Sequence, residues 1–210
     1  MSHSIIVTGA SGFIGSALCK KLNIHNSYNV IQLNKSNGFD FNNVNWIKNI
    51  KVDNVKTVIH LAQSNFYRDF PDKTNDMITV NIQATAQLLD WSRRHGVERF
   101  IFASTGNVYK PSTDKLNEKS YVEPISFYGS TKLACELLIN QYKEFFQIIN
   151  MRLFGVYGPF QKKMFIADII EKVINENDIY LAKGIGLYIT PVYIDDVVEI
   201  ILDLAVNPID

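Results

Sequence analysis

The sequence is poor in the residues that build metal centres and disulfide frameworks. Two cysteines and four histidines occur among its 210 residues. Cys19 and Cys135 show neither a CxxC pair nor a Cys/His ligand spacing, so we expect two reduced cysteines that serve packing. The histidines, at positions 3, 25, 60 and 95, are equally scattered. We therefore expect no metal site, and a structural role for His60 at the end of an apolar run.

The sequence also lacks an excess of charge and any long apolar run. Its 21 lysines and arginines balance 21 aspartates and glutamates, so no general field attracts nucleic acid or an anionic membrane. No run approaches the ~18 apolar residues of a membrane-spanning helix. The first ten residues carry no basic region of the kind that opens a signal peptide. We expect a soluble, cytoplasmic protein with neither a nucleic-acid nor a membrane partner.

Short apolar runs alternate with helical patterns along most of the chain. After the first run, Ile14, Ala17, Leu18 and Leu22 share one helical face. This alternation predicts an α/β fold, a doubly wound parallel sheet of the Rossmann type with ligand sites at the carboxyl ends of its strands. The expected strands are Ser4–Thr8, Val30–Leu33, Thr57–Leu61, Arg99–Ser104 and Gln147–Leu153, and two further helices are expected over Met77–Arg94 and Tyr128–Glu144.

The remaining segments have a different character. Gly106–Phe127 is polar and without sustained period, which is typical of a long active-site loop. Beyond Pro159 we expect a helix over Phe165–Asn175, a turn at Gly184–Gly186, a strand over Val192–Ile194 and a helix capped by Asp195. We therefore divide the chain at residue 157, into residues 1–157 with the expected sheet and residues 158–210 with the changed pattern.

Two patterns carry chemistry. Gly9, Gly12 and Gly15 follow the first strand at intervals of three, a spacing that suits a tight turn, close approach to a pyrophosphate and close helix–strand packing. An ordinary strand–helix turn with chance glycines is the alternative. Tyr128 and Lys132 lie four apart on one helix, where the ammonium would lower the tyrosine pKa from about 10 and make a general base. Two surface residues are the alternative, which the spacing alone favours.

Five segments together resemble the extended short-chain dehydrogenase/reductase family, and more closely its NAD-dependent epimerase/dehydratase branch, which acts largely on nucleotide-activated sugars. The similarity continues to Val192–Val197 (VYIDDV), nearly the whole chain, although the chain ends short of where relatives finish. The resemblance therefore implies a dinucleotide-binding, Rossmann-like domain over residues 1–157 and a partial substrate-binding region over residues 158–210. The five segments are Thr8–Gly15 (TGASGFIG), Ile59–Ala62 (IHLA), Ser104–Tyr109 (STGNVY), Tyr128–Lys132 (YGSTK) and Arg152–Pro159 (RLFGVYGP).

The resemblance implies a role for each matching residue. Tyr128 would be the general base, Lys132 would bind the nicotinamide ribose and tune the tyrosine, and Thr105 would hydrogen-bond the reacting oxygen. Thr105, Asn107 and Tyr128 would contact the substrate. The implied NAD or NADP site comprises Gly9, Ser11, Gly12, Phe13, Ile14, Gly15, Asn34, Lys35, Asp40, Phe41, Leu61, Ala62, Gln63, Asn81, Ser104, Tyr128, Lys132, Phe154, Gly155 and Val156.

Three departures from the family pattern bear on specificity. Asn34-Lys35 replaces the acidic residue usual in NAD-preferring members, which leaves room for the 2′-phosphate of NADP. Gly106-Asn107 offers no carboxylate after Thr105, which disfavours elimination of water or carbon dioxide. The loop at residues 187–191 lacks the arginine that commonly clamps a sugar nucleotide's diphosphate.

We therefore expect an NAD(P)-dependent oxidoreductase or epimerase that acts on a nucleotide-activated sugar by tyrosine-assisted hydride transfer. The alternatives are an NADP-dependent keto-sugar reductase, a non-catalytic dinucleotide-binding regulator, and a truncated family member without turnover. The helices over Met77–Arg94 and Tyr128–Glu144 correspond to those that pair in family dimers, so a homodimer is a further expectation.

Overall fold

The computed structural model describes residues 3–24, 28–161, 164–181, 184 and 188–207. Its centre is a five-stranded sheet in which every neighbouring pair is parallel, in the order β2-β1-β3-β4-β5. This arrangement confirms the predicted fold class. The strands are β1 (Ser4–Thr8), β2 (Asn29–Leu33), β3 (Val55–His60), β4 (Arg99–Thr105) and β5 (Gln147–Leu153).

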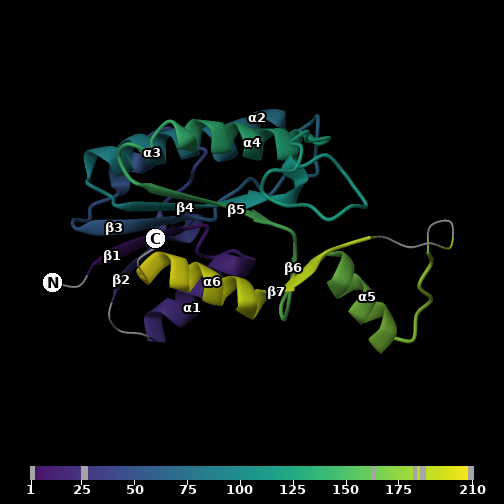
Figure 1. Cartoon of the computed structure of the whole chain (residues 1–210). Coiled ribbons are helices and arrows are strands. Elements are labelled where there is room, and N and C mark those ends of the chain that lie inside the picture. The colour runs from purple at the N-terminus through teal and green to yellow at the C-terminus, as the bar shows by residue number, and fades with distance from the viewer. Residues whose placement is uncertain (1–2, 25–27, 162–163, 182–183, 185–187, 208–210) are drawn as a thin grey trace.

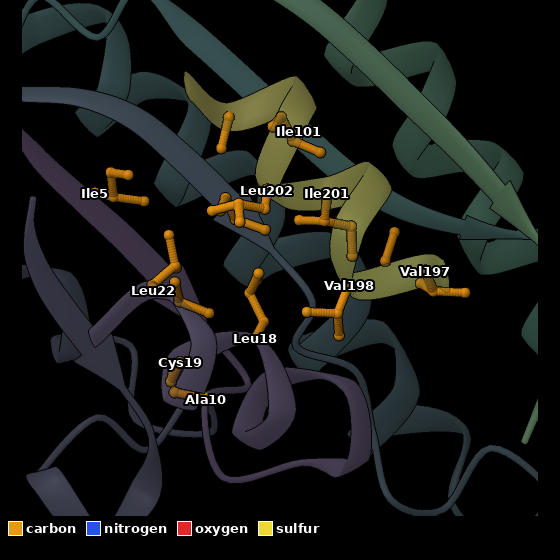
Figure 2. Packing of buried hydrophobic residues seen from close by; sticks show 14 of the residues in the cluster. Ile5, Ala10, Leu18, Cys19, Leu22, Ile101, Val197, Val198, Ile201 and Leu202 are labelled. Carbon is orange, nitrogen blue, oxygen red and sulfur yellow. The ribbon is translucent and has the colours of Figure 1, made fainter. Parts of the chain in front are cut away.

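Helices cover both faces of the sheet (Figure 1). One face carries α1 (Phe13–Ile24) and α6 (Ile194–Val206), and the opposite face carries α3 (Ala84–Arg94) and α4 (Phe127–Asn140). Figure 2 shows the first layer, where Val198, Ile201 and Leu202 of α6 meet Leu18 and Leu22 of α1. A second apolar cluster, on the α3 and α4 side, includes Trp46, Leu88, Phe100, Cys135 and Ile139. The predicted amphipathic stripes therefore bury the sheet from both sides.

The helix predicted over Met77–Arg94 begins earlier and is interrupted. It opens with α2 (Thr74–Met77), continues as a π-helical segment, η3 (Ile78–Gln83), and ends as α3. A π-helical turn displaces backbone groups from their α-helical partners. The carbonyl of Asn81 accordingly accepts hydrogen bonds from Cys135 Sγ, at 3.1 Å, and from Thr85 Oγ1.

A second, small sheet was not predicted in full. β6 (Gly155–Tyr157) pairs in parallel with β7 (Pro191–Tyr193), which lies one residue earlier than the strand predicted from the sequence. α5 (Phe165–Ile174) follows β6, stands apart from the main sheet in Figure 1 and buries none of its residues. Ile185 and Gly186 of the predicted turn, Leu187 after it, and His25 lie outside the described residues.

Several element boundaries differ from the predictions. α4 ends at Asn140 rather than Glu144, because a tight turn from Tyr142 brings Phe146 into the core just before β5. Asp195 is not the cap of α6: Tyr193 holds that position without a side-chain hydrogen bond, and Asp195 lies in the first turn. The described residues also include the 3₁₀ segments η1 (Lys35–Asn37), η2 (Trp46–Asn49) and η4 (Gly106–Val108).

The division at residue 157 stays a prediction. α6, which it assigns to the second region, packs against α1 under the main sheet. Within the described ranges, no helix combines the length and the apolar character needed to cross a bilayer.

Candidate functional site

The carboxyl ends of the strands open into one large cavity. The chain winds from β1 to β2 in one direction and from β3 to β5 in the other, so the order reverses between β1 and β3. Ligands of open α/β sheets bind at such a point. The cavity, of about 2970 Å³, extends from Gly9 past Tyr128 to Phe160. This volume exceeds the roughly 300–1,000 Å³ that is typical of a pocket for one drug-sized ligand.

The glycine turn packs against the neighbouring strand end as its spacing predicts. Gly9 has a φ of +67°, and a Cβ there would lie 2.8 Å from the backbone nitrogen of Ala62. A Cβ on Gly15 would lie 2.1 Å from the carbonyl oxygen of Gly9. Only glycine fits at either position: at Gly9 both the positive φ and the lack of space exclude a side chain, and at Gly15 the lack of space alone excludes it. The N-terminus of α1 is thereby held at the cavity wall, where its amide groups suit a pyrophosphate.

His60 lies beneath this turn and is structural. Ala62 N–H donates to Thr8 Oγ1 at 3.1 Å, and Thr8 Oγ1 lies 2.6 Å from His60 Nδ1. His60 Nε2 lies 2.8 Å from Thr85 Oγ1, whose proton is donated to the carbonyl of Asn81. This pattern assigns the ring proton to Nε2. Burial lowers the pKa of His60 to about 3, so the ring is a neutral link between β1, β3 and α3.

Tyr128, at the start of α4, places its hydroxyl in the cavity. Ser126 caps this helix by accepting from Gly129 N–H at 3.0 Å. The Tyr128 hydroxyl donates to Gln63 Oε1 at 2.7 Å. It also hydrogen-bonds the side chain of Thr105, which ends β4. The three predicted groups, Thr105, Tyr128 and Gln63, are therefore brought together at one point.

The pKa of Tyr128 beside Lys132 shifts in the opposite direction from the one that the sequence predicts. Burial raises the pKa of Tyr128 above its ordinary value, although its bond to Thr105 opposes the shift. Lys132 is 1% exposed, and its ammonium donates to the carbonyl of Ala103 at 2.8 Å and lies 5.9 Å from the tyrosine ring centre. The expected lowering of the tyrosine pKa is wrong for this structure, because desolvation outweighs a cation that does not reach the hydroxyl. Burial also lowers the pKa of Lys132, to about 8.

An aromatic wall replaces the carboxylates that the sequence lacks after Thr105. A Cβ on Gly106 would lie 2.7 Å from the ring of Phe154, so the ring occupies the space that a side chain would need. Phe154 stacks on Tyr109, with ring centres 6.2 Å apart, and the Arg152 guanidinium lies 4.7 Å from the Tyr109 ring centre. These contacts fix the wall beside Thr105.

A buried ion pair anchors this wall to the sheet and to α4. Glu136 Oε2 accepts from Arg152 Nη2 at 2.7 Å, and Glu136 Oε1 accepts from the Ser104 hydroxyl. The Glu136 side chain is 4% exposed. Its carboxylate raises the pKa of Arg152 above the ordinary value. Ser104 therefore serves this anchor through its hydroxyl, a role that the motif did not reveal.

The opposite end of the cavity contains the residues expected to meet adenosine. The side-chain oxygen of Asn34 is engaged by its own turn, because it accepts hydrogen bonds from Asn37 N–H at 3.0 Å and from the Ser36 hydroxyl at 2.6 Å. Lys35 Nζ lies 2.9 Å from Asp40 Oδ2. Phe41 lies edge-on to Trp46, with ring centres 4.6 Å apart. Asn34 is thus a cap of η1 as well as a cavity residue.

Most of the predicted site residues line the one cavity, and two do not. Asn81 and Lys132 are buried behind its wall, where Asn81 accepts from Ser64 N–H at 2.8 Å and donates to Thr131 at 2.9 Å. They therefore support the wall. The residues on the wall are Gly9, Ser11, Gly12, Phe13, Ile14, Gly15, Asn34, Lys35, Asp40, Phe41, Leu61, Ala62, Gln63, Ser104, Thr105, Asn107, Tyr128, Phe154, Gly155 and Val156.

Sequence reasoning missed a group on the segment between β3 and α2. Tyr67 lies 5.5 Å from the Tyr128 ring centre, and Arg68 stacks over Tyr67 and donates to Met164 Sδ at 3.2 Å. Asp76, from α2, also lines the cavity. No motif marks these positions. In the described part of the chain, no three histidine, cysteine or acidic side chains gather as metal ligands would.

A family comparison decides the classification. The profile of the NAD dependent epimerase/dehydratase family matches residues 5–208. The chain belongs to this family. Its relatives include a protein named as an uncharacterized UDP-glucose epimerase of Bacillus subtilis, 34% identical over 187 residues, which are 75% of the chain and 58% of that protein. A UDP-glucuronate 4-epimerase of Thermodesulfobacterium geofontis is 30% identical over 73% of the chain and 56% of that enzyme.

Solved structures of family members agree with the fold. UDP-glucuronic acid 4-epimerase from Bacillus cereus, in complex with UDP-glucuronic acid and NAD, matches with a TM-score of 0.81 and 28% identity over 95% of the chain and 72% of that structure. MoeE5, in complex with UDP-glucose and NAD, matches with a TM-score of 0.79 and 28% identity over 97% and 72%. The chain thus spans little more than half of the two curated relatives described above and almost three quarters of these structures.

Proposed function

We propose that the protein is an NAD-dependent epimerase of a UDP-activated sugar. The observation that carries the proposal is the shared cavity, in which the glycine turn before α1 and the hydroxyls of Thr105 and Tyr128 face the same space. Family members with the same fold hold NAD together with a UDP-sugar. Residues that bind a dinucleotide and residues that handle a sugar hydroxyl are thus within reach of one another.

The residues present fit the nicotinamide dinucleotide. Gly9 and Gly15 let the backbone of the turn pack closely against Ala62 and the start of α1, which brings the amide groups at the start of α1 to the cavity wall. Gly12 and Ser11 continue that wall, and Leu61, Ala62 and Gln63 follow along the neighbouring strand end. These residues would hold NAD, which when bound would supply reversible hydride acceptance next to the sugar.

The chain's own residues would position the sugar and move its proton. Thr105 would hold the sugar oxygen by a hydrogen bond, and Tyr128 would take the hydroxyl proton from it. Return of the proton from Tyr128, after the sugar has turned its other face to the hydride, would complete the epimerisation. Gln63 Oε1 accepts a hydrogen bond from the Tyr128 hydroxyl at 2.7 Å in this structure, so the hydroxyl points into the cavity before a sugar enters.

Tyr128 needs positive charge nearby before it acts as a base. Its pKa is raised by burial, so the hydroxyl is protonated at neutral pH. Lys132 supplies one cation from behind the wall, and oxidised nicotinamide brings another when it is bound. We therefore infer that the tyrosine becomes a base only in the loaded protein.

Tyr128→Phe tests this role. We expect loss of epimerisation by at least 10²-fold, the contribution typical of a general base, with NAD affinity retained in a calorimetric titration. Tyr121→Phe is the matched control, because Tyr121 is exposed and lies outside the cavity wall. Unchanged turnover in Tyr128→Phe would remove the tyrosine from the base's role.

The helix layer on the α3 and α4 side supports a homodimer as part of the proposal. Leu137 and Leu138 of α4 and Phe145 after it are exposed, at 60%, 38% and 56%. Exposed apolar side chains of this kind, on α4 and on the segment after it, suit contact with a second copy. Light scattering should show a dimer that Leu137→Glu dissociates, and a monomer at every concentration would contradict it.

A further inference from the structure

We infer that Arg68 binds an oxyanion of the sugar nucleotide, either a carboxylate on the sugar or the diphosphate, an inference that rests on the proposed function. Arg68 lies between β3 and α2 and lines the cavity. Its guanidinium stacks over Tyr67, 5.2 Å from the ring centre, and the Tyr67 ring centre lies 5.5 Å from that of Tyr128. The cation is therefore linked to the proposed base through one aromatic ring.

The guanidinium contacts a sulfur atom that an oxyanion can replace. Arg68 Nη2 donates to Met164 Sδ at 3.2 Å, and the Tyr67 hydroxyl donates to the same sulfur at 3.5 Å. A thioether is a weak acceptor. A carboxylate or phosphate oxygen forms a charge-assisted hydrogen bond with arginine, which is roughly twice as strong as a neutral one. An oxyanion that enters the cavity would therefore displace the sulfur from Nη2.

The backbone that carries Arg68 is fixed where it leaves β3. Ser64 is 1% exposed, and its N–H donates to Asn81 Oδ1 at 2.8 Å. Its hydroxyl accepts from Phe66 N–H at 3.1 Å and donates to the Asp76 carboxylate. These bonds tie the segment to α2 and η3. Because a group that is placed before its ligand arrives loses less freedom on binding, this support favours a binding role for the segment.

The other side chains of the cavity wall favour Arg68 for this role. In the part of the wall that the structure describes, Arg68 is the only arginine. Three lysines of the wall, Lys21, Lys35 and Lys110, form ion pairs with carboxylates. Residues 188–190 line the wall without a charge, in the loop where the sequence lacks an arginine. Only arginine offers a planar fork that matches two oxygens at once.

The test is calorimetric titration of the NAD-loaded full chain with UDP-glucose and, separately, with UDP-glucuronate. Arg68→Gln should weaken binding of at least one of them about tenfold at low salt, the size of one hydrogen bond to a charged group. The loss should shrink at high salt, because an exposed charge is screened. Equal losses for both sugars assign the diphosphate to Arg68, and a loss confined to UDP-glucuronate assigns the carboxylate. Arg68→Lys keeps the charge without the fork and should restore only part of the affinity.

Arg94→Gln is the matched control, because Arg94 is an exposed arginine of α3 outside the cavity wall. It should leave both affinities unchanged, and Arg68→Gln should leave the affinity for NAD unchanged. If Arg68→Gln binds both sugars as the wild type does, or loses NAD to the same extent as the sugars, the inference is overturned and the proposed function stands. Failure of the wild type to bind either sugar would overturn the proposed function, and this inference with it.

Discussion

Removal of the Glu136 carboxylate should destabilise the fold and loosen the wall beside Thr105. The carboxylate accepts from Arg152 through both oxygens, with the shortest contact at 2.7 Å, and from the Ser104 hydroxyl. Glu136→Gln leaves the shape unchanged but turns an NH₂ group toward either the guanidinium or the serine. An uncompensated buried charge costs about 3–5 kcal/mol. Because the Arg152 side chain is 22% exposed and reaches some water, we expect about 3 kcal/mol.

Urea unfolding, followed by tryptophan fluorescence and far-ultraviolet circular dichroism, measures this loss. For a chain of this length, about 3 kcal/mol corresponds to a melting temperature lower by roughly 6–12 °C. Asp90→Asn is the control, because Asp90 pairs with Arg93 and Arg94 on an exposed helix surface and such pairs contribute at most about 1 kcal/mol. If Glu136→Gln costs no more than Asp90→Asn, the carboxylate does not anchor the wall.

Three further outcomes are expected. Burial lowers the pKa of Lys132 to about 8 from 10.5, so between these pH values the unfolded chain binds more protons than the folded chain, and the free energy of unfolding rises with pH by roughly 3 kcal/mol in full. Lys132→Met should lack this rise. Identical pH profiles of the wild type and the variant in urea unfolding would disprove the prediction. Gly106→Ala should push the Phe154 ring aside and reduce turnover more than NAD affinity, and equal losses in both would count against a wall that shapes the sugar site. NAD should change the fluorescence of Trp46, because Trp46 contacts Phe41 and Phe41 lines the cavity. The binding of NAD near Phe41 would be contradicted if the wild type shows no saturable fluorescence change, or if the same change persists in Trp46→Phe.

The main sheet could be predicted because its strands are apolar runs that differ little from their observed bounds. β1 and β5 match residue for residue, since each lies between clear turn or helix signals. β6 could not be predicted as a strand, because three residues carry no period and their partner, β7, lies more than thirty positions later. The π-helical segment around Asn81 has no sequence signal either, since the carbonyl of Asn81 is satisfied by hydrogen bonds from the side chains of Cys135 and Thr85.

The candidate site divides in the same way. Glycine spacing and the Tyr128–Lys132 interval act locally, so the sequence shows them. The direction of the tyrosine pKa shift depends on burial by distant segments and was therefore missed. The pairing of Glu136 with Arg152 likewise depends on how α4 lies against β5, which no motif encodes.

Proton NMR of the full chain incubated with NAD and UDP-glucose, and separately with UDP-glucuronate, tests the central claim most directly. An NAD-dependent UDP-sugar epimerase should convert at least one of these sugars to its C4 epimer with no net consumption of NAD, and the conversion should vanish in Tyr128→Phe. Calorimetric binding of NAD and the sugars without any epimer in the NMR spectrum would contradict the claim and favour a dinucleotide-binding regulator.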